Sequence, residues 1–183
     1  MRVITGTAKG HKLKAPKGMN TRPTTDRIKE TIFNIINVYP DDIILDLFSG
    51  SGSVGIEFLS RGAKKCFFVD NDISSHKIIV ENIEKTKLKD KSEVYKMNYN
   101  NALSILNNKN VKFHYIFLDP PYGNNLICES VILIDKYDLL AEDGIIIAEH
   151  EKKLKLDKFK DKYIIDTRNY GDTSVSFFKK QEA

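Results

Sequence analysis

Short, almost purely apolar segments alternate with helix-length segments over most of the chain, and this alternation restricts the possible folds more than any other feature. Residues 43–47, 113–119 and 144–149 contain few polar side chains, as is typical of strands buried on both faces of a sheet. The stretch 74–87 has isoleucines at helical spacing. Strand, helix and strand in this order predict a mostly parallel sheet with helices on both faces.

The same pattern places the individual elements. Strands are expected at residues 43–47, 65–70, 93–97, 113–119, 144–149, 163–168 and 174–179. Helices are expected at 25–38, 53–60, 74–87, 101–107 and within 126–140. Residues 2–13 carry β-branched residues and two glycines, which predict an N-terminal β-hairpin. We therefore expect one α/β domain at 1–183, with a Rossmann-like core at 24–183 and a basic hairpin or arm at 1–23.

Composition narrows the class of protein. The chain has 183 residues, of which 41% are hydrophobic and 30% charged, as in an ordinary soluble globular protein. No apolar run approaches the roughly 20 residues that a membrane span needs, and the N-terminus lacks the apolar core of a signal peptide. We expect a cytoplasmic protein with no membrane contact, with Cys66 and Cys128 as buried free thiols. The four histidines lack metal-ligand spacing, so no metal site is expected.

Positive charge is concentrated near the N-terminus. No acidic residue occurs before Thr25, and the positive residues there are Arg2, Lys9, Lys12, Lys14, Lys17 and Arg22. Such a segment can neutralise phosphates and favours a nucleic-acid partner, although a solvated lysine-rich surface explains the charge equally well. The second lysine-rich stretch, 152–162, alternates with apolar residues and is interpreted as a solvated amphipathic segment.

A glycine-rich segment joins the first expected strand to its helix. Gly50, Gly52 and Gly55 allow a tight turn and close approach of a ligand beside a helix N-terminus. Asp70, at the end of the second strand, is placed to accept hydrogen bonds from ribose hydroxyls. The glycines also fit a nicotinamide dinucleotide, or a turn that binds nothing. Asp46 favours S-adenosylmethionine, because a carboxylate suits its ammonium group and would be poorly placed beside a pyrophosphate.

The fourth expected strand ends in Asp119-Pro120-Pro121-Tyr122, which points to methylation of an amine. The lone pair of an exocyclic base amine is delocalised into the ring, so the nitrogen has to be oriented towards the methyl donor. The Asp119 carboxylate and the Pro120 carbonyl can accept the two amine hydrogens, and the prolines restrict the turn. Tyr122 offers a face on which a flipped base can stack. Catalysis would then consist mainly of positioning and electrostatics.

The acidic residue at position 119 carries information about the base. Guanine presents adjacent N1–H and N2–H donors, and a carboxylate can accept both. Adenine presents N6–H beside an N1 acceptor, which suits an asparagine amide better. We therefore expect the N2 amine of guanine to be the target.

With these residues in view, the chain resembles the bacterial family of class I, S-adenosylmethionine-dependent methyltransferases that modify N2 of guanine 966 in 16S rRNA. The resemblance covers residues 1–179. It is carried by Arg2-Val3-Ile4-Thr5-Gly6, Lys9-Gly10-His11-Lys12-Leu13, Thr21-Arg22-Pro23-Thr24-Thr25-Asp26-Arg27, Asp46-Leu47-Phe48-Ser49-Gly50-Ser51-Gly52, Ser60-Arg61-Gly62-Ala63, Asp119-Pro120-Pro121-Tyr122 and Tyr170-Gly171-Asp172-Thr173.

The resemblance implies a set of functional residues. The catalytic pocket would contain Asp119, Pro120 and Tyr122. The cofactor site would contain Asp46, Phe48, Gly50, Ser51, Gly52, Asp70, Asn71, Asn98 and Tyr99. RNA contacts would come from Arg2, Lys9, Lys12, Arg22, Thr24 and Arg27. The chain departs from the family at Asn98, where an acidic residue is common, and at Asp70, where glutamate is common.

The function expected from the sequence is methylation of guanine N2 in 16S rRNA, within the small ribosomal subunit or an assembly intermediate, by a monomeric rRNA-processing enzyme. A DNA adenine-N6 or protein-amide methyltransferase shares the Pro-Pro-aromatic chemistry and remains an alternative. An RNA-binding module without catalysis is a second alternative. A nicotinamide oxidoreductase is a third, but no hydride-transfer residues accompany the glycines.

Overall fold

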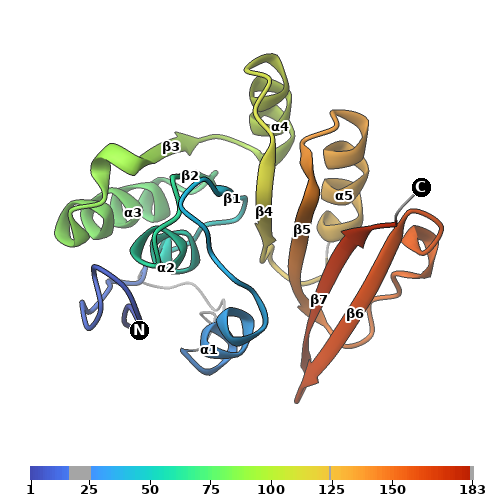
Figure 1. Ribbon diagram of the computed structural model, residues 1–183, viewed down its shortest axis with the longest axis horizontal. Helices are drawn as coiled ribbons and strands as arrows, with labels where there is room; N and C mark the ends of the chain where they lie inside the picture. The colour runs from blue at the N-terminus through green and yellow to red at the C-terminus, as the bar shows by residue number, and fades with distance from the viewer. Residues whose placement is uncertain (17–25, 124, 182–183) are drawn as a thin grey trace.

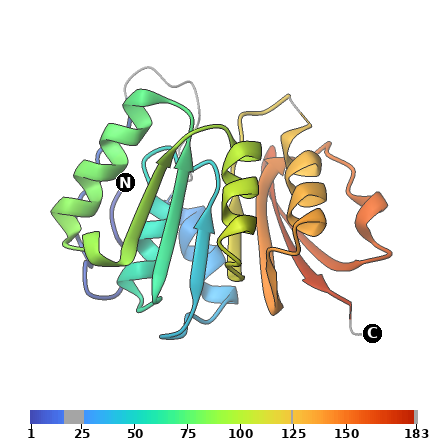
Figure 2. The ribbon, with the colours of Figure 1, turned by 90° about the horizontal axis from the view of Figure 1, so that it is seen from above.

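A computed structural model describes residues 1–16, 26–123 and 125–181 of the chain. A seven-stranded sheet runs through the molecule with helices on both faces (Figures 1 and 2). The strands are β1 Ile43–Asp46, β2 Lys65–Asp70, β3 Ser92–Lys96, β4 Phe113–Leu118, β5 Leu140–Glu151, β6 Tyr163–Tyr170 and β7 Thr173–Lys180. The helices are α1 Asp26–Ile35, α2 Ser53–Ser60, α3 Ile73–Thr86, α4 Tyr99–Asn108 and α5 Leu126–Lys136.

The strand order is β3-β2-β1-β4-β5-β7-β6, and all pairs from β3 to β5 are parallel. At the other edge, β7 is antiparallel to both of its neighbours, β5 and β6. The chain winds outward from β1 to β3, then returns to β4 on the other side of β1. This reversal separates the loops that follow β1 and β4 and opens a crevice at the carboxyl ends of the strands. The predicted α/β fold with a mostly parallel seven-stranded sheet is confirmed.

Two buried apolar clusters hold the layers together, one on each face of the sheet. One includes residues from α1, α2 and α3, with the Phe33 and Phe58 rings 4.7 Å apart. The other includes residues from α4 and α5, with Phe113 against Phe67. Both cysteines are buried free thiols, as predicted. Within the described residues, no helix is long and apolar enough to cross a membrane.

The N-terminal segment differs from a regular hairpin. Its strands are short: one antiparallel bridge joins Arg2 and Lys12, and the N–H groups of Val3 and Leu13 donate to the His11 and Met1 carbonyls. The N–H groups of Ile4 and Thr5 bind the Glu57 carboxylate at 2.8 and 3.0 Å, so they are not available for a ladder of strand hydrogen bonds. The Ala8 N–H donates to the Ser60 hydroxyl at 2.9 Å. The segment, the N-terminal loop, is therefore a short and irregular hairpin fastened to α2, and Val3, Ala8 and Leu13 are buried within the core.

Candidate active site

A glycine turn joins β1 to α2 at the crevice. Gly50 and Gly52 have φ angles of 54° and 76°, a left-handed conformation that other residues adopt only with strain. Gly55 lies inside α2, where a Cβ atom would come within 2.3 Å of the Phe68 ring and 2.7 Å of the Cys66 sulfur. The turn and the close contact of α2 with β2 bring backbone N–H groups to the edge of the cavity beside the helix N-terminus.

Asp70 ties the end of β2 to this turn. One of its carboxylate oxygens accepts the Gly50 N–H at 2.8 Å, and the other accepts the Asp72 N–H at 2.9 Å. Burial raises the pKa of the Asp70 carboxyl, while these two hydrogen bonds oppose the rise. The side chain therefore shapes the glycine turn and also lines the cavity, where the sequence predicted a ribose contact.

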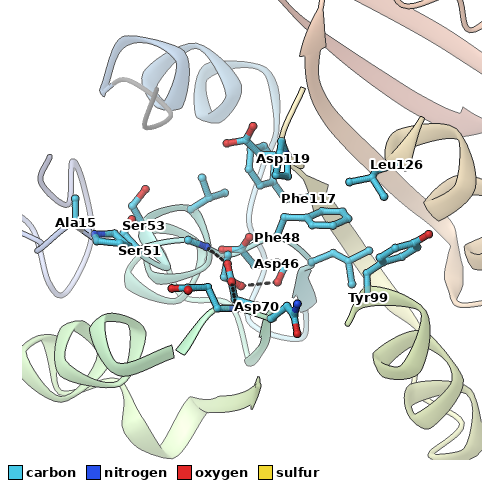
Figure 3. A pocket seen from close by; sticks show the side chains of 18 of the residues that line it. Ala15, Asp46, Phe48, Ser51, Ser53, Asp70, Tyr99, Phe117, Asp119 and Leu126 are labelled. Atoms are coloured by element: carbon cyan, nitrogen blue, oxygen red, sulfur yellow. Dashed lines mark hydrogen bonds between the residues drawn. The ribbon is translucent and has the colours of Figure 1, made fainter. Parts of the chain in front are cut away.

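Asp46 lies at the end of β1 and is almost fully buried. Its carboxylate accepts the Gly55 N–H at 3.0 Å. Burial raises its pKa to about 7, the Gly55 hydrogen bond opposes this, and the neighbouring charge of Asp70 adds to it. Figure 3 shows the two carboxylates close together within the cavity. Two carboxylates in one buried wall favour a ligand that carries positive charge at this point.

These residues belong to one cavity of about 580 Å³ at the carboxyl ends of the strands. Phe48 and Tyr99 lie side by side in its wall, with ring centroids 5.6 Å apart. The Tyr99 hydroxyl donates to Glu129 at 2.6 Å, which fixes the ring. Of the predicted cofactor residues, those that line the cavity are Asp46, Phe48, Gly50, Ser51, Asp70, Asn71, Asn98 and Tyr99. Gly52 shapes the turn as the N-cap of α2 and does not line the cavity.

The predicted catalytic segment follows β4 and separates two cavities. Asp119 and Pro121 line the large cavity, and Figure 3 shows Asp119 at its upper border. Pro120 and Tyr122 line a second cavity of about 300 Å³. Pro121 and Leu126 contribute to both walls, so the two cavities adjoin at this loop. The Tyr122 side chain is half exposed, and its hydroxyl is 3.0 Å from the Thr173 hydroxyl at the start of β7.

Those predicted RNA contacts that the structure describes do not line either cavity. Arg2, Lys9, Lys12 and Arg27 are exposed on the N-terminal loop and α1. The Arg2 carbonyl accepts a hydrogen bond from Lys29, and the Lys12 carbonyl accepts one from Lys85, which fix the backbone of the loop. Arg22 and Thr24 lie outside the described residues.

Sequence reasoning missed part of the cavity wall. Met1, Ala15 and Pro16 line the large cavity beside Ser51, whose hydroxyl is 3.5 Å from the Met1 sulfur. Met97 lines it as well. No local pattern marks Met1, Ala15 or Pro16, because they reach the cavity through contacts between segments far apart in the sequence.

A buried ion pair was also missed. Lys29 on α1 and Glu57 on α2 are fully buried, with their charged groups 3.6 Å apart. Glu57 also accepts from Arg61 at 2.9 Å, and burial lowers the pKa of Lys29. Glu57 thus joins the N-terminal loop and α1 to α2.

The strand order, the glycine turn and the cavity together define a class I methyltransferase fold, and solved structures agree. A hypothetical protein from Thermus thermophilus has a TM-score of 0.85 with 26% identity over 98% of this chain and 99% of its own. An Escherichia coli structure titled "Putative methyltransferase yhhF" has a TM-score of 0.83 with 28% identity over 100% and 99%. The chain belongs to the family described as conserved hypothetical protein 95, whose model matches residues 1–179.

Curated relatives confirm the family resemblance drawn from the sequence. A Bacillus subtilis protein named "Putative rRNA methyltransferase YlbH" is 43% identical over 99% of this chain and 100% of its own length. "Ribosomal RNA small subunit methyltransferase D" of Escherichia coli is 34% identical over 82% of this chain and 75% of its own.

Proposed function

We propose that the protein transfers a methyl group from S-adenosylmethionine to the N2 amine of a guanine in 16S rRNA, at a position of the guanine 966 type. One observation carries the proposal: the Asp119-Pro120-Pro121-Tyr122 loop lies between the large cavity and the second one. A methyl donor on one side and a base on the other would meet at this loop. The names of the rRNA methyltransferase relatives support an RNA substrate.

The large cavity has the chemistry that S-adenosylmethionine requires. The ligand carries an ammonium and a sulfonium group, and the cavity has Asp46 and Asp70 in its wall. Phe48 and Tyr99 offer apolar faces for the adenine, and the Asn98 amide oxygen is available to accept from the adenine amine. When bound, the cofactor supplies an electrophilic methyl group.

The chain's own part in the reaction is positioning. Asp119 and the Pro120 carbonyl would accept the two hydrogens of the guanine N2 amine and turn its lone pair towards the methyl donor. The Tyr122 ring, steadied by the hydrogen bond with Thr173, would stack on the unpaired base from the second cavity. Base stacking on an aromatic ring contributes about 1–3 kcal/mol, enough to offset much of the cost of unstacking the base.

RNA contacts on the N-terminal side would come from Arg2, Lys9, Lys12 and Arg27, with Arg22 and Thr24 as further members of the set. We propose that residues 1–23 act as this RNA-contacting part of a single domain whose core spans 24–183. The substrate would be 16S rRNA in the small subunit or an assembly intermediate, and the protein would act as a monomer in the cytoplasm.

Transfer of a labelled methyl group from S-adenosylmethionine to small subunits that lack the modification, followed by nucleoside analysis, tests the proposal. The wild type is compared with Asp119→Ala and with Asp90→Ala, an exposed carboxylate in the turn before β3. We expect N2-methylguanosine from the wild type and Asp90→Ala, and none from Asp119→Ala. Transfer to DNA adenine or a protein amide instead of RNA would contradict the proposal. Cofactor binding without any transfer would favour a non-catalytic RNA-binding module.

A further inference from the structure

A lysine-rich segment follows β5, and one of its lysines lines the second cavity. Lys153 lines this cavity together with Tyr122, and Lys152 and Lys155 lie on either side of it in sequence. All three side chains are exposed. Among the described residues, none of the three has a carboxylate within 4 Å. By contrast, Lys160 and Lys162 further along pair with Asp157 and Asp135.

The segment that carries these lysines is held in place. The Lys152 N–H donates to the Asp172 carbonyl in the turn between β6 and β7 at 3.2 Å. The Leu154 N–H donates to the Glu151 carbonyl at 3.1 Å, and Leu156 is buried against the core. An anchored backbone displays its cations at defined positions, so less conformational entropy is lost on binding than from a free tail.

These lysines and the N-terminal loop lie on different sides of the loop that follows β4. The N-terminal loop packs on α2 and α3, beside β1 and β2, whereas the lysines follow β5 and contact the β6–β7 turn (Figure 1). The loop after β4 lies between the two regions, since β4 separates β1 from β5 in the sheet. The second cavity, which Lys153 lines, is also lined by Glu149 and Glu151. Phosphates would therefore stay at the basic border, while the donors of a base face the acidic interior.

We propose that Lys152, Lys153 and Lys155 form a second RNA-backbone surface, which holds the phosphates next to the flipped nucleotide from the side opposite the N-terminal loop. This inference rests on the proposed RNA substrate. Two phosphate-binding surfaces on either side of the catalytic loop would hold the strand at both flanks of the target base. Removing one phosphate-binding cation lowers the slope of log affinity against log salt by about 0.7–0.9.

The test compares two triple variants with the same reduction in positive charge. Lys152→Gln, Lys153→Gln and Lys155→Gln are combined in one protein. The control combines Lys87→Gln, Lys89→Gln and Lys91→Gln, exposed lysines before the amino end of β3 that also have no carboxylate within 4 Å among the described residues. RNA affinity is measured for a small-subunit rRNA fragment across salt concentrations. Binding of S-adenosylmethionine and the melting temperature are measured for each protein.

We expect the first variant to lose RNA affinity by on the order of tenfold in about 0.1 M salt, with a salt slope smaller by about 2–3. Its cofactor affinity and melting temperature should equal those of the wild type, and the control should bind RNA like the wild type. Equal losses of RNA affinity in both variants would indicate an effect of net charge and would overturn the inference. Unchanged RNA affinity in both variants would overturn it as well. If the wild type methylates RNA while the first variant binds it normally, only this inference fails. If the wild type does not methylate RNA, the proposed function fails.

Discussion

The carboxylate of Asp70 accepts the backbone N–H of Gly50 at 2.8 Å, joining the end of β2 to a left-handed residue of the glycine turn. One side chain therefore fixes the turn and lines the cavity in which we propose that the cofactor binds. Its removal would disturb both the shape of the turn and any hydrogen bond to the ligand.

Asp70→Ala should weaken binding of S-adenosylmethionine by about 1–3 kcal/mol, since two backbone donors lose their acceptor, and this is about fivefold to 150-fold in Kd. Asp70→Asn keeps one acceptor oxygen and should lose less affinity for S-adenosylmethionine than Asp70→Ala does. Titration calorimetry measures both. Equal affinity for wild type and Asp70→Ala would show that the turn holds its shape without this carboxylate.

Cofactor affinity should depend on the protonation of Asp46. Burial raises its pKa to about 7, so the carboxyl becomes neutral as the pH falls below 7, whereas a cationic ligand binds best to the charged form. The amino group of the ligand is largely protonated below pH 7, because an α-amino group has a pKa of about 7.7–8.0. Affinity of the wild type should therefore fall as the pH is lowered from 7, through the pKa of Asp46, and that of Asp46→Asn should change much less. Parallel pH profiles for the two proteins would contradict this assignment.

Gly55→Ala should destabilise the fold by about 1–3 kcal/mol, because the new methyl group would overlap the Phe68 ring and the Cys66 sulfur. Urea unfolding monitored by circular dichroism measures the loss. Adding Phe68→Leu removes the ring atoms that the methyl group would overlap. The double variant should therefore lose about 1 kcal/mol less unfolding free energy than the two single variants lose together. Additive effects would mean that α2 shifts away from β2 to accommodate the methyl group.

Removing either partner of the buried Lys29–Glu57 pair should lower the free energy of unfolding, and the loss should be larger for Glu57 than for Lys29. Glu57→Gln leaves the Lys29 ammonium without its nearest carboxylate and should cost about 3–5 kcal/mol of unfolding free energy. Lys29→Met leaves Glu57 with Arg61 and two backbone N–H groups and should cost less. Urea unfolding gives the free energies, and amide hydrogen exchange at Ile4 and Thr5 should accelerate in Glu57→Gln. Equal costs for the two variants would contradict this division of contacts.

The sheet could be predicted because buried parallel strands leave a strong local pattern. The seven expected strands are present, but β5 begins at Leu140 instead of residue 144, since its first residues include Glu142 and Asp143 and lack an apolar run. The cavity-lining residues that the sequence marked belong to motifs between a strand and a helix. Met1, Ala15 and Pro16 were not marked, because only tertiary contacts bring them to the cavity.

The N-terminal loop also has a consequence for the order in which the molecule is assembled during translation. Ile4 and Thr5 bind Glu57, and the Lys14 N–H binds the Asn82 side chain at 2.9 Å. These residues are therefore synthesised well before the partners to which they bind. Until α2 and α3 have been synthesised, this basic, partly apolar segment lacks the surface on which it folds, so the wall that it gives to the large cavity cannot form before both helices are present.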